Sequence, residues 1–321
     1  MNFDRIEAAA RRSRAEIRAT PLLASPFLDE IAGRRVLVKA EPLQRTGSFK
    51  FRGAFSALSA LDPAARARGV LAYSSGNHAQ GVALAAALHE VPAVIVMPRD
   101  APALKVANTR ALGAEIVLYD RAGGESREEI GARLAEARGL SLVRPYDDPE
   151  VIAGQGSVGL ELARQLPDDA AGDVLVCCGG GGLTSGVALA LDVLRPDLRV
   201  RPVEPEGFDD VARSLAAGRI VANDRVSGSI CDAIVTPSPG ELTFPILSRL
   251  CGPGLSVTDD EVLRAVALAF LRLKIVCEPG GAVALAAALF RPDMVAGDTV
   301  TVVASGGNVD PQLFARALGS L

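Results

Sequence analysis

The sequence has few aromatic side chains and very few histidines. Its 321 residues include no tryptophan, two histidines (His78 and His89) and 4% aromatic residues. So few rings argue against a surface that stacks nucleic-acid bases, and the net charge of −4 argues against a basic face for phosphates. With only two histidines, a metal site built on imidazoles is close to excluded. We therefore expect no nucleic-acid partner.

The five cysteines form no recognisable motif. No pair has the C-x-x-C spacing of zinc or redox sites, and scattered cysteines among apolar neighbours are typical of reduced core residues in the cytosol. The first twenty residues lack the apolar segment of a secretory signal. Apolar stretches such as residues 281–290 fall short of the roughly 20 residues that a membrane span requires. These absences predict a cytoplasmic protein with no membrane partner.

The chain is instead rich in apolar residues, at 49%, and they recur in a regular order. Short β-branched runs alternate with Ala/Leu-rich stretches of helical periodicity along almost the whole length. The predicted strands cover residues 35–41, 69–74, 93–98, 114–119, 173–178, 199–204 and 298–304. Strands separated by helices predict βαβ units, and therefore an α/β fold with mostly parallel sheets covered on both faces.

The polar stretch RPYDDPE, residues 144–150, is the best candidate for a domain boundary. It separates a compact β/α block, residues 53–146, from a longer part that follows it. Because this block is small, we expect residues 1–52 to pack with residues 147–321 as the large domain, which leaves 53–146 as the small domain.

The dinucleotide pattern G-x-G-x-x-G occurs once, at residues 154–159. Such a fingerprint must follow a strand and open a helix, so that the pyrophosphate meets free amide groups. The preceding residues, DDPEVIA, do not have the sequence pattern of a strand. A nicotinamide site is therefore the weaker interpretation, and glycines that permit close helix packing are the better one.

A second glycine cluster, Gly179–Gly182, has the right context. It follows the predicted strand 173–178 and opens the apolar helix LTSGVALALDVL, so that several amides and the helix dipole would face one anion. A tight turn is the simpler alternative, but four consecutive glycines exceed what a turn requires. Two further polar loops, residues 73–81 and 305–310, also end predicted strands. Ligands bind beyond the carboxyl ends of parallel strands, so we expect the three loops to form one site.

Lys50 is the candidate reactive side chain. It starts a predicted helix between Phe49 and Phe51. An apolar setting at a helix N-terminus disfavours the cationic form, which makes a neutral amine accessible for Schiff-base chemistry. A surface lysine whose aliphatic stem packs along the two rings is the alternative, and this segment alone does not decide between them.

Six motifs together resemble the threonine/serine dehydratases, the group of pyridoxal-phosphate enzymes that includes serine racemase. In chain order they are TPLLAS (20–25), TGSFKFRGA (46–54), SSGNHAQG (74–81), GGGGLTSG (179–186), EPGGAVALAA (278–287) and SGGNVD (305–310). The match runs over nearly the whole chain. It implies a fold-type II enzyme, similar to the β subunit of tryptophan synthase, with two open twisted sheets flanked by helices.

The resemblance also implies a role for each matching residue. Lys50 would hold pyridoxal 5′-phosphate (PLP) as a Schiff base and act as acid and base on one face of the substrate Cα. Ser75 would serve the opposite face, as in serine racemase. The other implied cofactor contacts are Phe49, Asn77, Gly179, Gly180, Gly181, Gly182, Leu183 and Ser305. The implied contacts of the substrate carboxylate are Ser75, Gly76, Asn77 and His78.

The implied reaction is β-elimination from a β-hydroxy amino acid such as L-threonine or L-serine, which gives a 2-oxo acid and ammonia. In serine racemase-like members, the segment that aligns with VEPEGFDD binds Mg²⁺ or Ca²⁺, here through Glu204, the carbonyl of Phe208, and Asp210. A solvated acidic loop is the alternative for that segment. We expect a small-molecule amino acid substrate and a homodimer.

Four alternatives remain open, and one of them is a catalytically silent protein that binds the cofactor without turning over any substrate. Ala233 stands where family members often have glycine, so that 3-hydroxyaspartate or a hydroxyectoine-derived acid competes with threonine as substrate. An amino acid racemase on the same scaffold is the nearest rival, because Ser75 supplies a second acid–base group. A nicotinamide-dependent oxidoreductase is a rival from another class and depends on the weak pattern at residues 154–159.

Overall fold

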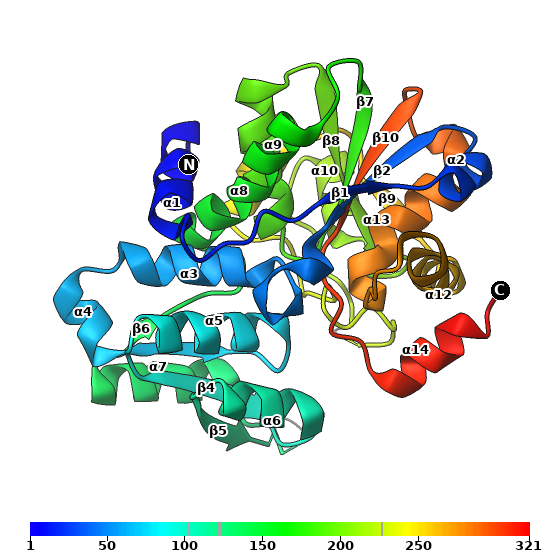
Figure 1. Ribbon diagram of the computed structural model, residues 1–321. Helices are drawn as coiled ribbons and strands as arrows, with labels where there is room; N and C mark the ends of the chain where they lie inside the picture. The colour runs from blue at the N-terminus through cyan, green and yellow to red at the C-terminus, as the bar shows by residue number, and fades with distance from the viewer. Residues whose placement is uncertain (102, 121–122, 226) are drawn as a thin grey trace.

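A computed structural model of the protein describes residues 1–101, 103–120, 123–225 and 227–321. It shows two β-sheets flanked by helices, which confirms the predicted fold class (Figure 1). The six-stranded sheet has the order β1 (Leu22–Ala24), β2 (Arg35–Ala40), β10 (Thr299–Ala304), β7 (Gly172–Cys177), β8 (Leu198–Pro205) and β9 (Leu255–Val257). The four-stranded sheet has the order β5 (Glu115–Tyr119), β4 (Ala93–Pro98), β3 (Val70–Tyr73) and β6 (Ser141–Leu142).

The strand pairings are parallel in both sheets, except that the edge strand β1 runs antiparallel to β2. The four-stranded sheet uses residues from within 53–146, and the six-stranded sheet uses residues from outside that range. The domain bounds themselves stay a prediction.

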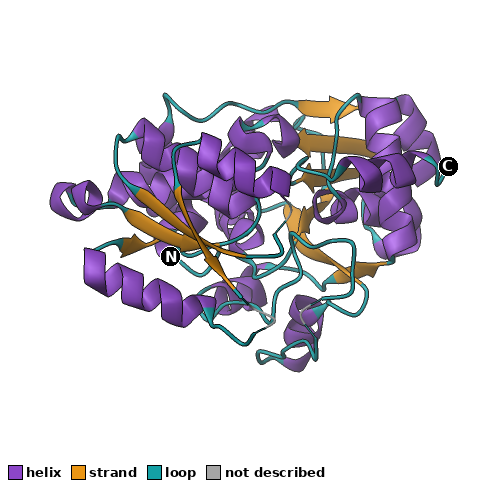
Figure 2. Cartoon of the chain, turned by 90° about the horizontal axis from the view of Figure 1, so that it is seen from below, coloured by secondary structure: helices purple, strands orange, loops and turns teal. Residues whose placement is uncertain are grey.

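Helices cover the sheets and connect successive strands, as Figure 2 shows from below. They are α1 (Phe3–Ser13), α2 (Pro26–Ala32), α3 (Lys50–Ala60), α4 (Pro63–Arg68), α5 (Asn77–Leu88), α6 (Ala103–Ala111), α7 (Arg127–Arg138), α8 (Pro149–Gln165), α9 (Gly182–Leu194), α10 (Asp210–Ala217), α11 (Thr243–Leu250), α12 (Asp259–Leu268), α13 (Pro279–Phe290) and α14 (Pro311–Leu318). A π-helical turn, η3 (Ala269–Leu273), extends α12.

Strand β7 shows why the large sheet is covered on both faces. Side chains alternate along a strand, so that Val174 and Val176 pack in the core with α8 and α9. Leu175 and Cys177 pack on the other face in the core that contains α13. Burial on both faces explains the nearly continuous apolar sequence of this strand.

The glycines of the G-x-G-x-x-G pattern lie inside α8 and pack against other helices. A Cβ atom on Gly154 would lie 2.5 Å from the carbonyl oxygen of Arg52, and one on Gly159 would lie 2.7 Å from the Cβ of Ala190. Their place in the middle of a buried helix confirms the helix-packing interpretation, because no free helix N-terminus meets a pyrophosphate there.

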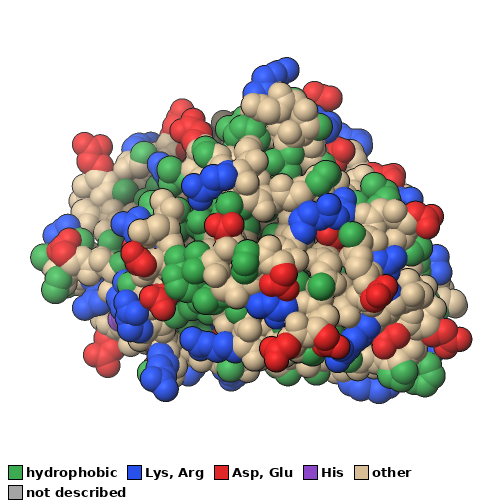
Figure 3. Space-filling view, turned by 90° about the horizontal axis from the view of Figure 1, so that it is seen from above, with side chains coloured by type: hydrophobic (Ala, Val, Ile, Leu, Met, Phe, Trp, Pro, Cys, Tyr) green, Lys and Arg blue, Asp and Glu red, His purple; other side chains and the backbone are tan. Residues whose placement is uncertain are grey.

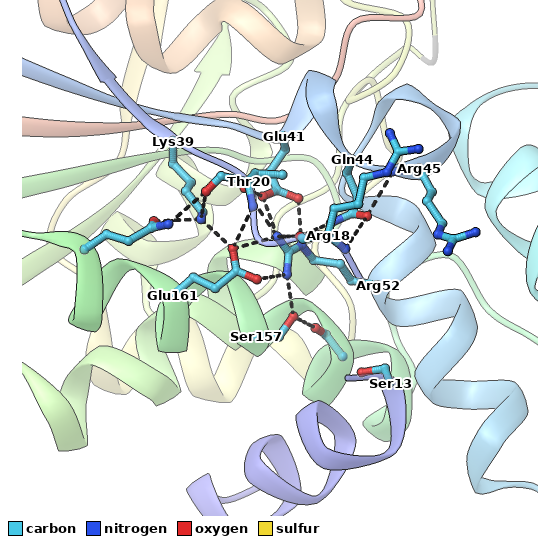
Figure 4. A network of polar contacts seen from close by, with 12 residues as sticks. Ser13, Arg18, Thr20, Lys39, Glu41, Gln44, Arg45, Arg52, Ser157 and Glu161 are labelled. Carbon is cyan, nitrogen blue, oxygen red and sulfur yellow. Dashed lines mark hydrogen bonds and ion pairs between the residues drawn. The ribbon is translucent and has the colours of Figure 1, made fainter. Parts of the chain in front are cut away.

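A buried ionic network fixes the first turn of α3 to the large sheet (Figure 4). Arg52 on α3 donates to both carboxylate oxygens of Glu41, at 2.7 and 2.8 Å, and to Glu161 on α8 at 2.7 Å. Lys39 on β2 donates to Glu161 at 2.5 Å and to the carbonyl of Thr20 at 2.7 Å. Two positive and two negative charges thus balance one another in the interior.

In the part of the chain that the structure describes, no helix is both long and apolar enough to cross a lipid bilayer. On the face seen in Figure 3, Lys and Arg side chains are interspersed with Asp and Glu. This face therefore carries no continuous basic surface of the kind that phosphate backbones require.

Candidate active site

Lys50 is the first residue of α3, directly after the N-cap Phe49. Its Nζ donates a hydrogen bond to the carbonyl of Pro145 at 2.7 Å and lies 5.1 Å from the centroid of the Phe49 ring. Desolvation lowers the pKa of Lys50 to about 8, and the nearby charge of Glu278 partly opposes this. The neutral amine is therefore far more accessible near neutral pH than it is in an exposed lysine, as the apolar flanks predict.

The four glycines connect β7 to α9, as predicted. Gly181 is the N-cap of α9 and has a φ of +93°, a conformation that favours glycine. Gly180 lies under the ring of Tyr146, where a Cβ atom would come within 2.3 Å of two ring carbons. No side chain caps α9, so its first amides are left without a side-chain hydrogen bond at this end.

A cavity of about 40 Å³ lies at this helix N-terminus, and we call it the glycine cavity. Phe49, Lys50, Tyr146 and residues 179–184 line it, together with Thr236. Among the described residues, the buried Oγ1 atoms of Thr184 and Thr236 have no hydrogen-bond partner. Unpaired hydroxyls and the positive end of a helix dipole fit an anionic group such as a phosphate.

A second cavity, of about 200 Å³, opens at the end of β3, and we call it the serine cavity. It is lined by Ser74–His78, which lead into α5, and again by Lys50, Tyr146 and Thr236. The serine cavity and the glycine cavity therefore meet at Lys50. Ser75 lies in the same cavity as the Lys50 side chain, as its implied role requires.

Asn77 lies at the centre of a group of buried polar side chains. Its Nδ2 donates to Glu278 Oε1 at 2.5 Å, and its Oδ1 accepts from Asn308 Nδ2 at 2.8 Å. Burial raises the pKa of Glu278 to about 7. A bridge between Ser48 and Gly306 joins the Lys50 segment to the loop after β10. Two of the three loops that were expected to converge, residues 73–81 and 305–310, are thus connected directly. The third, Gly179–Gly182, meets them through the glycine cavity, which shares Lys50 with the serine cavity.

His78 is buried and neutral, because desolvation lowers its pKa to about 3. Its Nε2 lies 2.9 Å from the carbonyl of Val143 and must donate there, because a carbonyl only accepts. Ser305 is buried, and its backbone carbonyl accepts from the amide of Phe49 at 3.1 Å. Ser305 therefore lies beside Phe49, where the pyridine contact was expected.

The predicted metal ligands lie outside both cavities, near the start of α10. Both carboxylate oxygens of Glu204 accept from backbone amides, at 3.0 and 2.8 Å, and Asp210 Oδ1 accepts from Asn223 at 2.6 Å. Burial and the neighbouring charge raise the pKa of Glu204, and burial raises that of Asp210 to about 6. Phe208 is buried beside them. In the described ranges no group of three or more His, Cys, Asp or Glu side chains is arranged to hold a metal.

Sequence reasoning missed the basic side chains of the serine cavity. Lys105 on α6 and Arg127 on α7 both line it, and Lys105 Nζ donates to Asp232 Oδ2 at 2.9 Å. Tyr73 and Tyr146 also line it. No local pattern marks these residues, because they come from different elements that only the fold brings together.

Comparison with known proteins decides the family. Residues 14–306 match the family described as "Pyridoxal-phosphate dependent enzyme". The chain belongs to this family. An L-threo-3-hydroxyaspartate ammonia-lyase of Pseudomonas sp. is 47% identical, over 97% of this chain and 96% of that protein. A serine racemase of Schizosaccharomyces pombe is 39% identical, over 98% of this chain and 97% of that protein.

The solved crystal structure of a threonine deaminase from T.th. has the same fold, with a TM-score of 0.91 and 46% identity. It covers 97% of this chain, and 99% of that chain is matched. This pyridoxal-phosphate dependent enzyme therefore has the predicted fold-type II architecture. The uncapped amides of α9, the unpaired threonine hydroxyls and the desolvated Lys50 amine fit the phosphate and the aldehyde of the cofactor.

Proposed function

We propose that this enzyme is an ammonia-lyase that eliminates water from a β-hydroxy amino acid with a second carboxylate, 3-hydroxyaspartate. The observation that carries the proposal is the pair of basic side chains, Lys105 and Arg127, in the cavity that also contains Lys50 and residues 74–78, which we call the serine loop. Lys105 is paired with Asp232 in the same cavity, whereas the carboxylate paired with Arg127, that of Glu128, does not line it. Arg127 is therefore the side chain that a second substrate carboxylate would meet. The relative at 47% identity acts on L-threo-3-hydroxyaspartate by its name, which supports this choice.

The two carboxylates of such a substrate would bind at opposite ends of the serine cavity. The α-carboxylate would bind the amides at the start of α5, where residues 75–78 leave a helix N-terminus free. The β-carboxylate would bind Arg127, whose planar guanidinium suits a carboxylate. Ala233 lines both cavities, and its methyl group narrows the space near Lys50 relative to the glycine of threonine dehydratases.

Bound PLP supplies an electron sink for negative charge at the substrate Cα. Lys50 Nζ would hold the cofactor and then carry the Cα proton, while Asn77 would donate to the cofactor ring and Ser305 would face its nitrogen. Phe49 would pack on the ring. Gly179, Gly180, Gly181, Gly182 and Leu183 would hold the phosphate. Loss of the Cα proton and the β-hydroxyl releases water, and hydrolysis of the product yields a 2-oxo acid and ammonia.

A 2-oxo acid assay with 3-hydroxyaspartate, L-threonine and L-serine tests this function. We expect the highest kcat/KM for 3-hydroxyaspartate. Arg127→Met should lower that value by about tenfold to a hundredfold, because a charge-assisted hydrogen bond is lost, with little change for serine. Lys50→Ala should lose both turnover and the visible absorption of the cofactor. Equal or higher efficiency with threonine would contradict the proposed substrate.

Amino acid racemisation is a second candidate function, and one observation favours it. Ser75 lies in the same cavity as Lys50, so a second acid–base group faces the site. Incubation with L-serine, followed by separate assays of D-serine and pyruvate, distinguishes the two reactions. We expect pyruvate to exceed D-serine. The reverse result would make racemisation the principal activity.

We further infer a divalent cation, Mg²⁺ or Ca²⁺, at Glu204, the Phe208 carbonyl and Asp210. Asp210 Oδ2 is buried and has no hydrogen-bond partner among the described residues, and two buried carboxylates close together favour a cation between them. Treatment of the protein with EDTA should lower its melting temperature, and added Mg²⁺ should restore it. Asp210→Asn should abolish this response. A melting temperature that is unchanged by EDTA would contradict the site.

We infer a homodimer from an apolar surface that we call the α2–α14 face. Its exposed members are Phe27, Ile31, Phe270, Leu271 and Leu318. The Arg272 guanidinium lies 4.5 Å from the Phe27 ring centroid, and the Phe270 and Phe314 rings are 5.5 Å apart, so that α2, η3 and α14 form one surface. Apolar patches of this kind mark association surfaces. The five cysteines are free thiols, which supports a reducing compartment, the cytoplasm.

A further inference from the structure

Tyr73 is the last residue of β3 and lies directly before the serine loop. The guanidinium of Arg127 lies over its ring, with Cζ 5.3 Å from the ring centroid. Both side chains line the serine cavity together with Lys50. The ring of Tyr73 is therefore a support for the basic side chain that we assign to the second carboxylate.

The packing around Tyr73 leaves its ring little freedom. Gly131 on α7 lies behind it, where an added Cβ atom would be 3.4 Å from Tyr73 Cδ1 and 3.3 Å from Leu71 Cδ2. The ring thus packs directly on the backbone of the helix that begins with Arg127. Strand β3 is itself held in register with β4, with Tyr73 opposite Val96.

Arg127 is held on a second side as well. It is the first residue of α7, and its Nε donates to Glu128 Oε1 at 2.8 Å. Because its side chain is 44% exposed, a free arginine here would sample many rotamers, and holding it still for a ligand would cost entropy. The aromatic face and the carboxylate together limit that motion before any substrate binds.

We propose that Tyr73 is a positioning residue that determines substrate specificity by holding the Arg127 guanidinium in the orientation that receives a second substrate carboxylate. This inference rests on the proposed function. The same strand end carries the serine loop for the α-carboxylate, so β3 sets the spacing between the two carboxylate sites. Binding of a dicarboxylic substrate depends on this spacing, because it occupies both sites, whereas serine and threonine have only one carboxylate.

The experiment compares the holoenzyme with Tyr73→Leu and Tyr73→Phe, measuring kcat/KM for 3-hydroxyaspartate and for L-serine. We expect Tyr73→Leu to lower the ratio of the two values by about fivefold to tenfold, mainly through KM for 3-hydroxyaspartate. Tyr73→Phe keeps the aromatic face and should leave the ratio unchanged. In an Arg127→Met background, Tyr73→Leu should have no further effect on the ratio, because the group that it positions is gone.

The outcomes separate this inference from the proposed function. A wild-type enzyme that does not prefer 3-hydroxyaspartate overturns both. Two results would overturn the role of Tyr73 alone. The first is a preference for 3-hydroxyaspartate in Tyr73→Leu that equals the wild-type preference. The second is an effect of Tyr73→Leu that is as large in the Arg127→Met background as in the presence of Arg127. An equal loss in Tyr73→Phe also overturns this role, because the hydroxyl and not the ring would then matter. If Tyr73→Leu does not fold, by circular dichroism, Tyr73→Met replaces it under the same criteria.

Discussion

The chemistry of Lys50 follows from its place at the junction of the two cavities. Its amine is desolvated beside Phe49, and this lowers its pKa to about 8 although Glu278 acts in the opposite direction. A neutral amine is the form that attacks an aldehyde. The free protein should therefore capture the cofactor efficiently at a pH where an exposed lysine, with a pKa near 10.5, is still protonated.

This gives a prediction for the protein stripped of cofactor. The rate at which added PLP forms its visible absorption band should rise with pH, with a midpoint near the Lys50 pKa of about 8. It should level off before pH 10, because Lys50 is half neutral at its pKa and nearly all neutral well above it. Glu278→Gln removes the charge that favours the ammonium form, so its midpoint should lie at a lower pH. A rate that keeps rising toward pH 10, as for a surface lysine, would contradict the assigned environment.

Individual site residues differ in how far the sequence could predict them. Lys50 and Asn77 lie in continuous motifs at predicted strand ends or helix starts, so that the neighbouring residues in the sequence identify them as site residues. Glu278 stands in a quoted motif but received no role, because its partner Asn77 is 201 positions away in the chain. Tyr146 lies in the stretch interpreted as a boundary, and Thr236 in an irregular loop. Their functions depend on long-range packing that no local pattern contains.

At the scale of elements, the start of α3 depends on its attachment to β2 and α8. Arg52 has no exposed side-chain surface, and its partner Glu41 is equally buried. Removal of one member of a buried ion pair leaves an uncompensated charge, which destabilises a protein far more than the loss of an exposed pair. The first turn of α3, which carries Lys50, therefore owes its position to charges in the core.

Two matched substitutions test this attachment. Arg52→Met should lower the free energy of unfolding by about 3–5 kcal/mol, because the buried Glu41 loses its cation and keeps only the hydroxyl of Thr20. Arg138→Met removes an arginine of an exposed pair with Glu115, whose side chains are 44% and 49% exposed, and should cost far less, because water screens this pair. Urea unfolding of both holoenzymes, followed by circular dichroism, measures the difference. Equal losses would contradict a special role for the network.

For strands with long apolar runs, the predicted ends lie within one or two residues of the observed ends. The shortest strands were not predicted. Strands such as β4 and β7 are apolar over most of their six residues, because both of their faces are buried. Strands β1, β6 and β9 have only three, two and three residues, which is too short for a pattern to appear. These segments are strands because they pair with a neighbouring strand, as β1 pairs with β2. Only the tertiary structure brings that neighbouring strand beside them.

At the scale of the whole molecule, the site lies where the two sheets face each other. The loops after β3, β7 and β10 meet there, as the rule for carboxyl ends of parallel strands predicts. The sequence could not predict how the sheets face each other. The ion pair between Lys105 on α6 and Asp232 on the side of the large sheet shows that arrangement directly. Substrate specificity depends on this arrangement, because Lys105 and Arg127 come from helices beside the small sheet, α6 and α7, whereas Lys50 begins α3.

Association of two chains is the remaining property at this scale, and the α2–α14 face makes it testable. Phe27→Glu and Leu271→Glu each place a charge on that face, and burial of an unpaired charge between chains would disfavour the dimer. Sedimentation velocity should show the mass of two chains for the wild type and of one chain for both variants. Val193→Glu is the control, because Val193 on α9 is as exposed as Phe27, at 53%, but lies on another element.

The control variant should remain a dimer. All three variants should keep the visible absorption of bound cofactor, because Lys50 and the Gly179–Gly182 loop lie together in the glycine cavity, away from the substituted positions. A dimer that survives both substitutions on the α2–α14 face, or that dissociates with Val193→Glu, would place the interface elsewhere. Loss of the absorption band in step with dissociation would instead show that the partner chain stabilises the loops around Lys50, and that the site is complete only in the assembly.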